Sequence, residues 1–370
     1  MTGGPVGVAI VGAGNISGQY LRTLGSFPDV RVLGIADLDA ERARAAAAEH
    51  GVPVAGDLDT VLAVDEVEIV VNLTVPVAHA QVATAALRAG KHVYGEKPFT
   101  ATPAEGEKVF AEAAERGLLL GGAPDTFLGA GIQSALRAVR EGRIGTPVGV
   151  ATATQSLGPE GWHPDPAFFY QPGAGPLFDI GPYYLTTLVA LFGPVSEVYA
   201  TGARGRAVRV VGSGPKAGQE FPVDVPTHVQ ALLTFASGVT ASSLFSFDSS
   251  IWRTSIEIVG SEGALALPDP NTFEGPLRLL TNGTKEWVEL PVEGSTAGRG
   301  LGVLDMARAL RRGVPHRASG ALALHVLKVM AAIAEAAESG EPRRLDTAGA
   351  APLTAPEPLP AGWDPYAAEL

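Results

Sequence analysis

One carboxylate and one phenol stand out in the apolar segment GPLFDIGPYYLTTLV, residues 175–189. Asp179 occupies a place where a core residue is expected, and Tyr183 follows it four positions later. Residues at this spacing share one face of a helix, with Cβ atoms about 6 Å apart. Both side chains could then enter one pocket, bind a hydroxyl group and move its proton. The alternative is a buried helix that Asp179 caps and whose tyrosines pack in the core.

Lysine is a residue type that can assist such a phenol, and Lys97 stands in a constrained segment. Tyrosine titrates at about pH 10 in water, too high for an efficient base at neutral pH, but a neighbouring ammonium group stabilises the phenolate. Lys97 lies in the segment YGEKP, after an apolar strand and before a ring-constrained proline. Pro182 also constrains the site, because proline is tolerated only in the first turn of a helix. The helix that carries Tyr183 is therefore predicted to begin close to Pro182.

The elements that must position these residues fall into two halves, of which the first alternates strands and helices. Apolar, β-branched runs predict strands at 6–11, 30–36, 67–73, 91–95 and 118–122, and Ala-rich stretches predict helices at 15–25, 39–50, 77–89 and 103–116. Strands that are apolar throughout are buried on both faces, and helices of this length cross over between parallel neighbours. The first half is predicted to be a doubly wound α/β domain.

The second half has a different pattern. A helix at 129–141 leads to a strand at 147–155, and further strands are predicted at 227–235, 238–247, 253–260, 276–281 and 286–291. Turn signals such as Ser237-Gly238 and Asn282-Gly283 separate them, as in an antiparallel sheet. Helices follow at 301–312 and 319–339. We predict a nucleotide-binding domain over 1–123, an α+β domain with a mainly antiparallel open sheet over 124–345, and a Pro/Ala-rich tail over 346–370.

A glycine-rich turn follows the first strand directly, in the sequence GAGNIS. The first glycine permits a tight turn, and the second lets backbone N–H groups approach a pyrophosphate at the N-terminus of the next helix. The third small position is Ser17, which we interpret as a tolerated departure from glycine. Because the turn follows the first strand and opens a helix, cofactor binding is favoured over a plain turn. The predicted binding residues here are Gly12, Gly14, Asn15 and Ile16.

Asp37, at the end of the second strand, predicts which cofactor binds. A carboxylate there accepts hydrogen bonds from the adenosine ribose hydroxyls and repels a 2′-phosphate. The prediction is NAD, with NADP as the alternative. Arg42 could serve that phosphate, but a solvated helix residue is the simpler interpretation.

Two further loops should border the cofactor, because ligands of an open parallel sheet bind outside the carboxyl ends of its strands. These loops follow the strands predicted at 67–73 and 91–95. His79 by itself is more often an ordinary residue of a helix N-terminus than a ligand. The cofactor-binding candidates in the two loops are Thr74, Pro76, His79, Glu96 and Lys97.

Taken together, GAGNIS, Asp37, TVPVAH, GEKP and GAGPLFDIGPYY resemble the Gfo/Idh/MocA family of glucose-fructose oxidoreductase and inositol dehydrogenase. The resemblance covers nearly the whole chain. It implies an N-terminal Rossmann domain, a nicotinamide cofactor, and a C-terminal sheet that often forms the interface of a homo-oligomer, a dimer or a tetramer. It also implies that Lys97 is the catalytic lysine and that the Lys97-Pro98 bond is cis. Many members have Asp-x-Gly-x-His where this chain has Tyr183, so we interpret the tyrosine as a variant of the same chemistry.

The resemblance implies an NAD-dependent oxidoreductase that moves a hydride between the nicotinamide and a secondary hydroxyl or ketone of a sugar, cyclitol or related polyol. Lys97 and Tyr183 would handle the proton, and Asp179 would orient the lysine or accept a second hydroxyl. An alternative is an NAD-dependent glycoside hydrolase or lyase that oxidises its substrate only transiently. A third class is a nucleotide-binding or redox-sensing protein without turnover.

Three weaker candidates for substrate contact are Trp162, His163 and Asp125. The tryptophan and histidine lie in the loop GPEGWHPDPAFFYQPGAG, where an aromatic face could stack on a sugar ring or cover the domain core. Asp125 follows the last predicted strand of the first half. It either lines the ligand-binding cleft or begins the linker to the second half. His228 alternates with apolar residues and is most simply a strand residue.

Composition excludes several classes. The net charge of −12 offers no basic surface for nucleic acid. The absence of cysteine excludes disulfides and thiolate metal sites, and no His, Asp and Glu spacing resembles a metal site. No signal peptide is evident, and no window reaches roughly 18 uncharged apolar residues. We therefore expect a cytoplasmic protein with a small-molecule substrate and no membrane or nucleic-acid partner.

Overall fold

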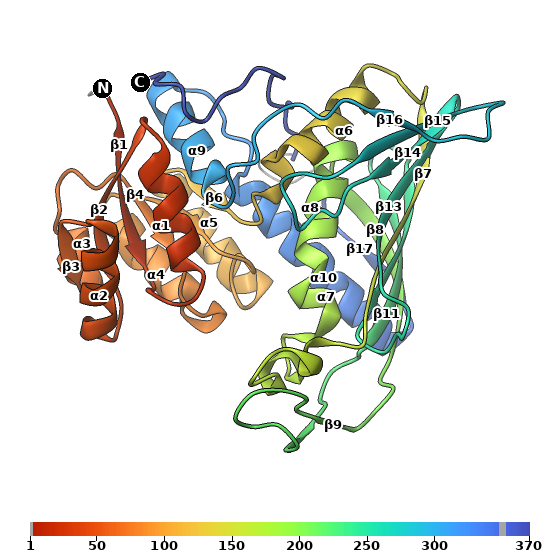
Figure 1. The fold of residues 1–370 in the computed structure, drawn as a ribbon, viewed down its shortest axis with the longest axis horizontal. Coiled ribbons are helices and arrows are strands. Elements are labelled where there is room, and N and C mark those ends of the chain that lie inside the picture. Colours follow the sequence, from red (N-terminus) through yellow and green to blue (C-terminus); the bar gives the residue numbers. More distant parts are fainter. Residues whose placement is uncertain (1–2, 348–352) are drawn as a thin grey trace. The chain divides into compact units, whose positions relative to one another are not determined.

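A computed structural model describes residues 3–347 and 353–370 of the chain. The chain divides into two compact units, each built from separate segments (Figure 1). Unit 1 comprises Met1–Ala130, Glu293–Leu327 and Leu359–Leu370, and unit 2 comprises Gly131–Val292 and Lys328–Pro358.

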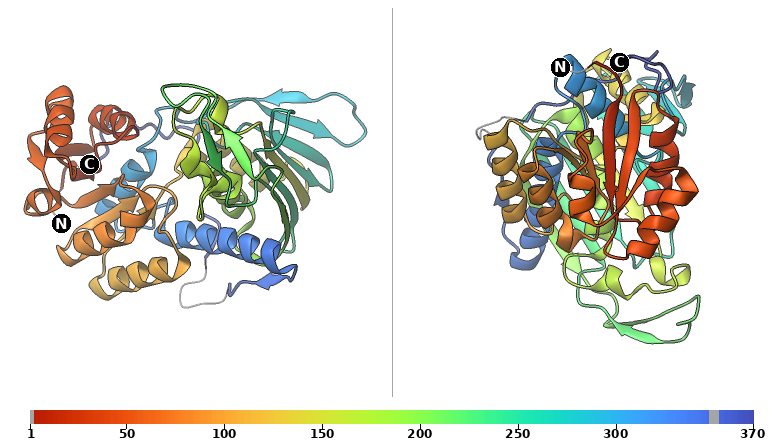
Figure 2. Two further views of the ribbon diagram at one scale, coloured as in Figure 1. Left: turned by 90° about the horizontal axis from the view of Figure 1, so that it is seen from below. Right: turned by 90° about the vertical axis from the view of Figure 1, so that its left-hand side faces the viewer.

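Unit 1 contains a six-stranded parallel sheet in the order β3-β2-β1-β4-β5-β6. This is the strand order of a doubly wound nucleotide-binding fold. Helices flank the sheet on both sides (Figure 2). The strands are β1 Val6–Val11, β2 Val30–Ala36, β3 Val54–Gly56, β4 Ile69–Asn72, β5 His92–Gly95 and β6 Leu120–Gly122. The helices are α1 Ser17–Ser26, α2 Ala40–His50, α3 Leu58–Leu62, α4 Pro76–Arg88, α5 Pro103–Arg116, the short 3₁₀ helix η1 Thr126–Leu128 and α9 Leu301–Arg312.

Local sequence signals account for the helix ends in unit 1. The Asp39 side chain caps α2 by accepting from two backbone N–H groups, and Thr102 forms a reciprocal capping box with Glu105 at the start of α5. Both helices end at a glycine in the left-handed conformation, Gly51 and Gly117. All six residues of β1 are buried, which is why its sequence reads as one apolar run.

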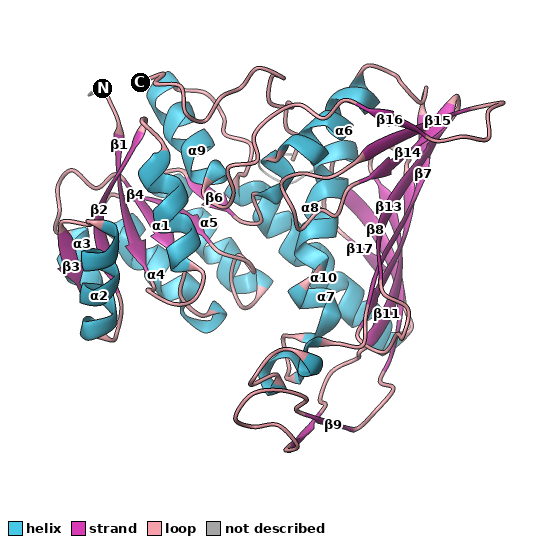
Figure 3. Cartoon of the chain, in the orientation of Figure 1, coloured by secondary structure: helices cyan, strands magenta, loops and turns pink. Residues whose placement is uncertain are grey.

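Unit 2 is built on a nine-stranded, mainly antiparallel sheet in the order β16-β15-β14-β13-β7-β12-β11-β8-β17. Figure 3 shows helices α6 and α8 on one of its faces. The strands are β7 Pro147–Gln155, β8 Val195–Ala203, β11 His228–Phe235, β12 Thr240–Ser246, β13 Arg253–Gly260, β14 Gly263–Leu267, β15 Leu277–Thr281, β16 Val288–Leu290 and β17 Arg343–Arg344. The helices are α6 Ala130–Arg140, α7 Gly175–Asp179, α8 Gly181–Phe192 and the 3₁₀ helices η2 Pro159–Gly161 and η3 Ala167–Tyr170.

A separate two-stranded ribbon, β9 Val208–Val210 with β10 Glu220–Pro222, interrupts the chain between β8 and β11. Its strands pair antiparallel, with Arg209 opposite Phe221. The sequence did not predict this ribbon, because its strands are short and most of their residues are polar or exposed. The longer strand β8 was not predicted either, and most of its residues are half-buried or exposed. Beside it, one buried cluster joins Tyr170, Val211, Phe221, Val223 and Phe247.

The fold class predicted from the sequence is confirmed, but the chain is divided differently from the predicted boundaries of 1–123, 124–345 and 346–370. Helix α9 and the last residues belong to unit 1. Arg308 of α9 explains this return, because its Nε donates to Asp29 Oδ2 at 2.7 Å and both side chains are almost fully buried. Arg311 adds two bonds of 2.6 Å to the Glu68 carboxylate. Leu359, within the predicted tail, is buried.

Helix α10, Gly320–Ser339, is long and apolar enough to cross a membrane by length and composition, with a window of mean hydropathy 1.5. Of that window, 61% is buried inside the protein. The helix also carries Lys328 and Glu335. These properties are those of a core helix.

Candidate active site

The turn between β1 and α1 has the backbone geometry that its glycines predict. Gly12 has φ of 104°, and a Cβ built there would lie 2.7 Å from the carbonyl carbon and oxygen of Leu73. Only glycine fits this position, because both the conformation and the close approach of the β4 loop exclude a side chain. At Gly14 an added Cβ would meet no atom within 4 Å, so the space before the helix is open.

The start of α1 is suited to an anion. Ile16 is the N-cap residue and provides no side-chain cap, so no side chain of the cap competes with an anion at this helix start. Ser17, the departure from the glycine pattern, is buried and donates its hydroxyl to Gly14 O at 2.7 Å. The serine therefore stabilises the turn. Asn15, in the same turn, is exposed.

Asp37 lies beside this turn. Its Oδ2 accepts from Ala13 N at 2.8 Å, and its Oδ1 accepts from Asp39 N at 2.9 Å. These bonds fix the carboxylate at the end of β2, the place where this kind of fold binds the ribose of a dinucleotide. Arg42 Nη1 is 3.7 Å from Asp37 Oδ1 and 55% of the arginine side chain is exposed. Arg42 is thus both solvated and close to the carboxylate.

The loops after β4 and β5 are tied together by His79. Its Nδ1 lies 2.7 Å from Pro98 O and its Nε2 lies 2.9 Å from Thr74 O. Asn72, at the end of β4, donates to His79 O at 3.0 Å and accepts from the Thr74 hydroxyl at 2.7 Å. His79 is buried, and its ring connects the two predicted cofactor loops. Its contact with a cofactor, like that of Pro76 at the start of α4, stays a prediction.

Glu96 holds the backbone of the lysine segment. Its Oε2 accepts from Lys97 N at 2.9 Å, and its Oε1 accepts from the Tyr20 hydroxyl at 2.8 Å. Burial raises the pKa of Tyr20 well above its usual value, and the negative charge of Glu96 adds to the rise. The phenol therefore remains a donor to Glu96 at neutral pH. The Lys97-Pro98 bond is cis, as the family resemblance implied.

Asp125 is buried at 1% exposure and has a structural function. Its Oδ2 accepts from Gly300 N at 2.8 Å and from Gly302 N at 3.0 Å, at the start of α9. Burial raises the pKa of Asp125 to about 6, against the lowering effect of these two bonds. The carboxylate secures the helix N-terminus, and a contact with substrate stays a prediction.

Unit 2 contains a cavity of about 170 Å³ that Asp179 lines. The predicted single helix is broken here: α7 ends at Asp179 and α8 begins at Gly181, with Pro182 in its first turn. This position of Pro182 confirms the predicted helix start. The N-cap residue of α8 is Ile180, so Asp179 is not the cap that the alternative interpretation required.

Two neighbouring tyrosines lie differently in α8. Tyr183 is 6% exposed, and it is Tyr184 that lines the cavity. The Tyr184 ring packs edge-on against Phe245 with centroids 6.3 Å apart, and burial raises the pKa of its phenol above the usual value. Because the helix breaks at Ile180, the four-residue spacing does not place Asp179 and Tyr183 on one continuous helical face.

The cavity also has an aromatic rim. Trp162 lines it with 65% of the residue exposed, and His163 packs edge-on against the indole at 5.6 Å between centroids. The sequence analysis missed Trp252, which lines the cavity and is 76% exposed. It also missed Asp269 and Asn271, which add polar groups to the lining. The signal that could have found Trp252 is a large aromatic residue between two predicted strands, where turn residues are expected.

Comparisons with known proteins match both halves of the chain. Residues 6–122 match the oxidoreductase family with an NAD-binding Rossmann fold, and residues 132–266 match the Gfo/Idh/MocA C-terminal domain. A dTDP-3,4-didehydro-2,6-dideoxy-alpha-D-glucose 3-reductase of Streptomyces violaceoruber is 32% identical over 268 residues, which are 70% of this chain and 72% of the relative. The trans-1,2-dihydrobenzene-1,2-diol dehydrogenase of Bos taurus is 26% identical and the match covers 76% of this chain and 79% of the relative.

A solved levoglucosan dehydrogenase, in complex with NADH and L-sorbose, shares the fold with a TM-score of 0.79 at 20% identity, over 93% of this chain and all of that chain. The fold and the first-unit turn thus define an NAD-binding oxidoreductase. The chain belongs to the Gfo/Idh/MocA family, as its sequence motifs implied.

Proposed function

We propose that this oxidoreductase transfers a hydride between NAD and a secondary hydroxyl or ketone of a sugar, cyclitol or related polyol. The observation that carries the proposal is the cavity that pairs the Asp179 carboxylate with the exposed indoles of Trp162 and Trp252. A carboxylate accepts hydrogen bonds from hydroxyl groups, and an indole face packs on the apolar face of a sugar ring. The relatives named above, a deoxysugar reductase and a diol dehydrogenase, support the same substrate class.

We assign the proton chemistry to three residues. A bound nicotinamide supplies or accepts the hydride. Lys97 and Tyr183 hold and move the proton of the reacting hydroxyl, and Asp179 accepts a hydrogen bond from a second hydroxyl or orients the lysine. The motif resemblance supports these roles. The held backbone of Lys97 and the lining position of Asp179 are compatible with them.

A panel of compounds tests the proposed function directly. The purified protein is incubated with NAD and myo-inositol, D-glucose, D-xylose, levoglucosan or a methyl glycoside, and nicotinamide absorbance is followed beside product analysis. We expect NADH to accumulate with at least one unmodified sugar or cyclitol. Cleavage of a glycoside without net NADH would instead identify a hydrolase or lyase, and NAD binding without turnover on a broad panel would identify a non-catalytic protein.

The cofactor assignment makes a separate prediction. Asp37→Ala should weaken NADH binding by about tenfold or more, because hydrogen bonds to a carboxylate contribute about 1.5–3 kcal/mol each. The preference for NADH over NADPH should also narrow, since the repulsion of a 2′-phosphate is removed. Fluorescence titration with both cofactors measures the two effects. The exposed Asp59→Ala variant serves as the control, and a wild-type protein that binds NADPH more tightly than NADH would refute the assignment.

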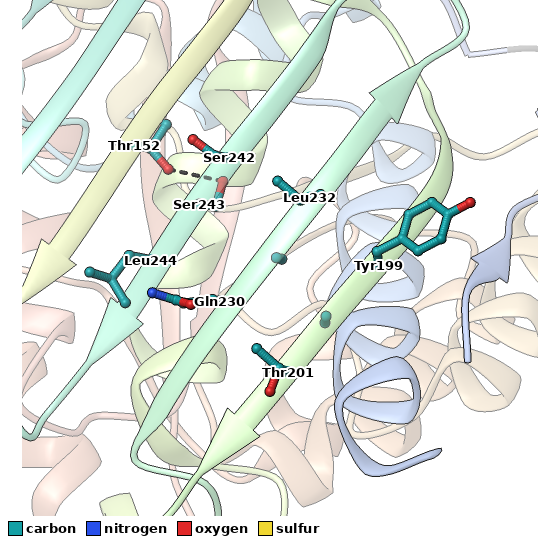
Figure 4. Close-up of a pocket in the computed structure, with 10 residues that line it drawn as sticks. Thr152, Tyr199, Thr201, Gln230, Leu232, Ser242, Ser243 and Leu244 are labelled. Carbon is teal, nitrogen blue, oxygen red and sulfur yellow. Dashed lines mark hydrogen bonds between the residues drawn. The ribbon is translucent and has the colours of Figure 1, made fainter. Parts of the chain in front are cut away.

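We also propose that the protein is a homo-oligomer, a dimer or a tetramer, through the outer face of the large sheet. Figure 4 shows this face around Tyr199, Leu232 and Leu244. Tyr199 and Leu232 are paired across neighbouring strands and are 46% and 59% exposed. A shallow groove of about 490 Å³ lies over the same strands. Exposed apolar side chains on a flat sheet are typical of an interface.

The interface proposal predicts a change of mass. Leu232→Glu should shift the protein towards monomer in analytical ultracentrifugation, because two copies would bring buried carboxylates together. Val314→Glu places the same charge at an exposed apolar position of unit 1 and should leave the mass unchanged. A wild-type monomer at micromolar concentration would contradict the proposal.

The cytoplasmic location stays a prediction from sequence.

A further inference from the structure

Arg209 is a buried cation that lies behind the cavity of unit 2 without lining it. It belongs to strand β9 of the two-stranded ribbon, and only 2% of its side chain is exposed. Its Nη1 donates to Leu157 O at 2.9 Å and to the Glu160 carboxylate. Its Nη2 donates to Phe247 O at 2.9 Å and to the Asp248 carboxylate. The two ends of one guanidinium group therefore bind two different segments.

Both segments contribute to the cavity lining, and they come from distant parts of the sequence. Glu160 is flanked by Gly158, Pro159 and Trp162, all of which line the cavity. Asp248 follows Ser246 and Phe247, which line it as well, and the same segment continues to Trp252. We call these the 157–162 wall and the 246–252 wall. Arg209 is bonded to both.

Further bonds keep the two carboxylates in place. The Tyr170 hydroxyl donates to Glu160, and the Thr227 hydroxyl donates to Asp248. The guanidinium carbon of Arg209 lies 4.9 Å from the centre of the Tyr170 ring, within the range of a cation–π contact. Burial raises the pKa of the Tyr170 phenol, so that it stays protonated and remains a donor.

The charge arrangement requires an arginine. A guanidinium group is planar and presents donors at two ends in fixed directions, whereas an ammonium group is a single point. Lysine at position 209 could reach one carboxylate and one carbonyl, but not both pairs. The other wall would lose its anchor while the ribbon itself, which packs through Phe221 and Val223 in the apolar cluster, keeps its core.

We propose that Arg209 is a positioning residue that fixes the 157–162 and 246–252 walls against each other, and thereby sets the affinity of the cavity for its sugar. This inference rests on the proposed function. It predicts that Arg209 affects binding of the sugar while the binding of NADH, which belongs to unit 1, is left unchanged.

The kinetic test compares Arg209→Lys with two matched controls. Arg206→Lys changes an exposed arginine just before strand β9. Asp165→Asn removes an exposed ion pair between Asp165, which follows the 157–162 wall, and Lys216, which lies between β9 and β10. For the panel sugar that the wild-type protein oxidises fastest, Arg209→Lys should raise KM by about tenfold with kcat within about twofold. The dissociation constant for NADH should not change. Both control variants should match the wild type.

A second variant separates the walls. Asp248→Asn weakens only the anchor of the 246–252 wall and should raise KM in the same direction by a smaller factor. Unchanged KM in both variants, or an equal loss in kcat and in NADH affinity, would overturn the proposal.

Hydrogen exchange provides a readout that needs no substrate. In Arg209→Lys, amide exchange should increase in residues 156–163 and 246–252 and stay unchanged in unit 1. Exchange that rises throughout unit 2, or in neither wall, would overturn the role of Arg209. A wild-type protein that turns over no sugar would contradict the proposed function, and the exchange result would still decide the role of Arg209.

Discussion

Lys97→Ala is expected to lower kcat by about 1,000-fold while the dissociation constant for NADH stays within about threefold of the wild-type value. A positioned acid or base contributes about 100- to 10,000-fold to a proton transfer, and an alanine offers neither a proton nor a charge. The predicted cofactor turn is held by other groups, since Asp37 Oδ2 accepts from Ala13 N and Gly12 keeps its own backbone conformation. Steady-state kinetics and NADH titration on the same preparation measure both quantities.

The design needs a control for the loss of an ammonium group alone. Lys108→Ala removes an exposed lysine from α5 and should leave kcat unchanged. Lys97→Arg retains the charge but cannot act as an acid at neutral pH, so its kcat should remain low if proton transfer is the function of the residue. Near wild-type turnover in Lys97→Ala would remove this residue from the mechanism. Thermal unfolding of each variant shows whether the fold is intact.

The sequence predicted the strands of unit 1 well because burial on both faces leaves a simple signal. Strands β1 and β2 occupy the predicted residues 6–11 and 30–36. Strand β3, with three half-buried residues, carries no such signal and was not predicted. The return of α9 to unit 1 was also beyond the sequence, because it depends on ion pairs such as Arg308 with Asp29, which are 279 residues apart.

The candidate site was predicted only in part, because some of its residues have a local sequence signal and others do not. Asp179 was found because a carboxylate interrupts an apolar run, and the structure places it in a cavity lining. Trp252 was missed because an aromatic residue in a loop has many explanations until the fold shows that it lines the same cavity as Trp162. The break of the helix at Ile180 was not evident either. Both α7 and α8 have a proline in the first turn, so either proline could have marked the start of a single helix.

Tyr183→Phe tests the proposed role of the Tyr183 phenol in moving the proton of the substrate. If the phenol moves the proton of the substrate hydroxyl, its removal should lower kcat by about 100-fold or more, with the NADH dissociation constant unchanged. Phenylalanine has the same ring, so the packing of this buried position should be retained. The measurement is kcat at several pH values, because the loss of a proton-transfer group also removes its limb from the pH profile.

The adjacent tyrosine makes the test decisive. Tyr184→Phe deletes the same atom one residue later, in a ring that lines the cavity and whose hydroxyl donates to Ala153 O at 3.4 Å. We expect this change to lower kcat by less than about threefold, and a larger loss there than in Tyr183→Phe would transfer the role to Tyr184. Tyr183→His should retain more activity than Tyr183→Phe, because many family members have histidine at this place and an imidazole can exchange a proton near neutral pH. Equal activity of the histidine and phenylalanine variants would show that the proton leaves by another group, such as Lys97.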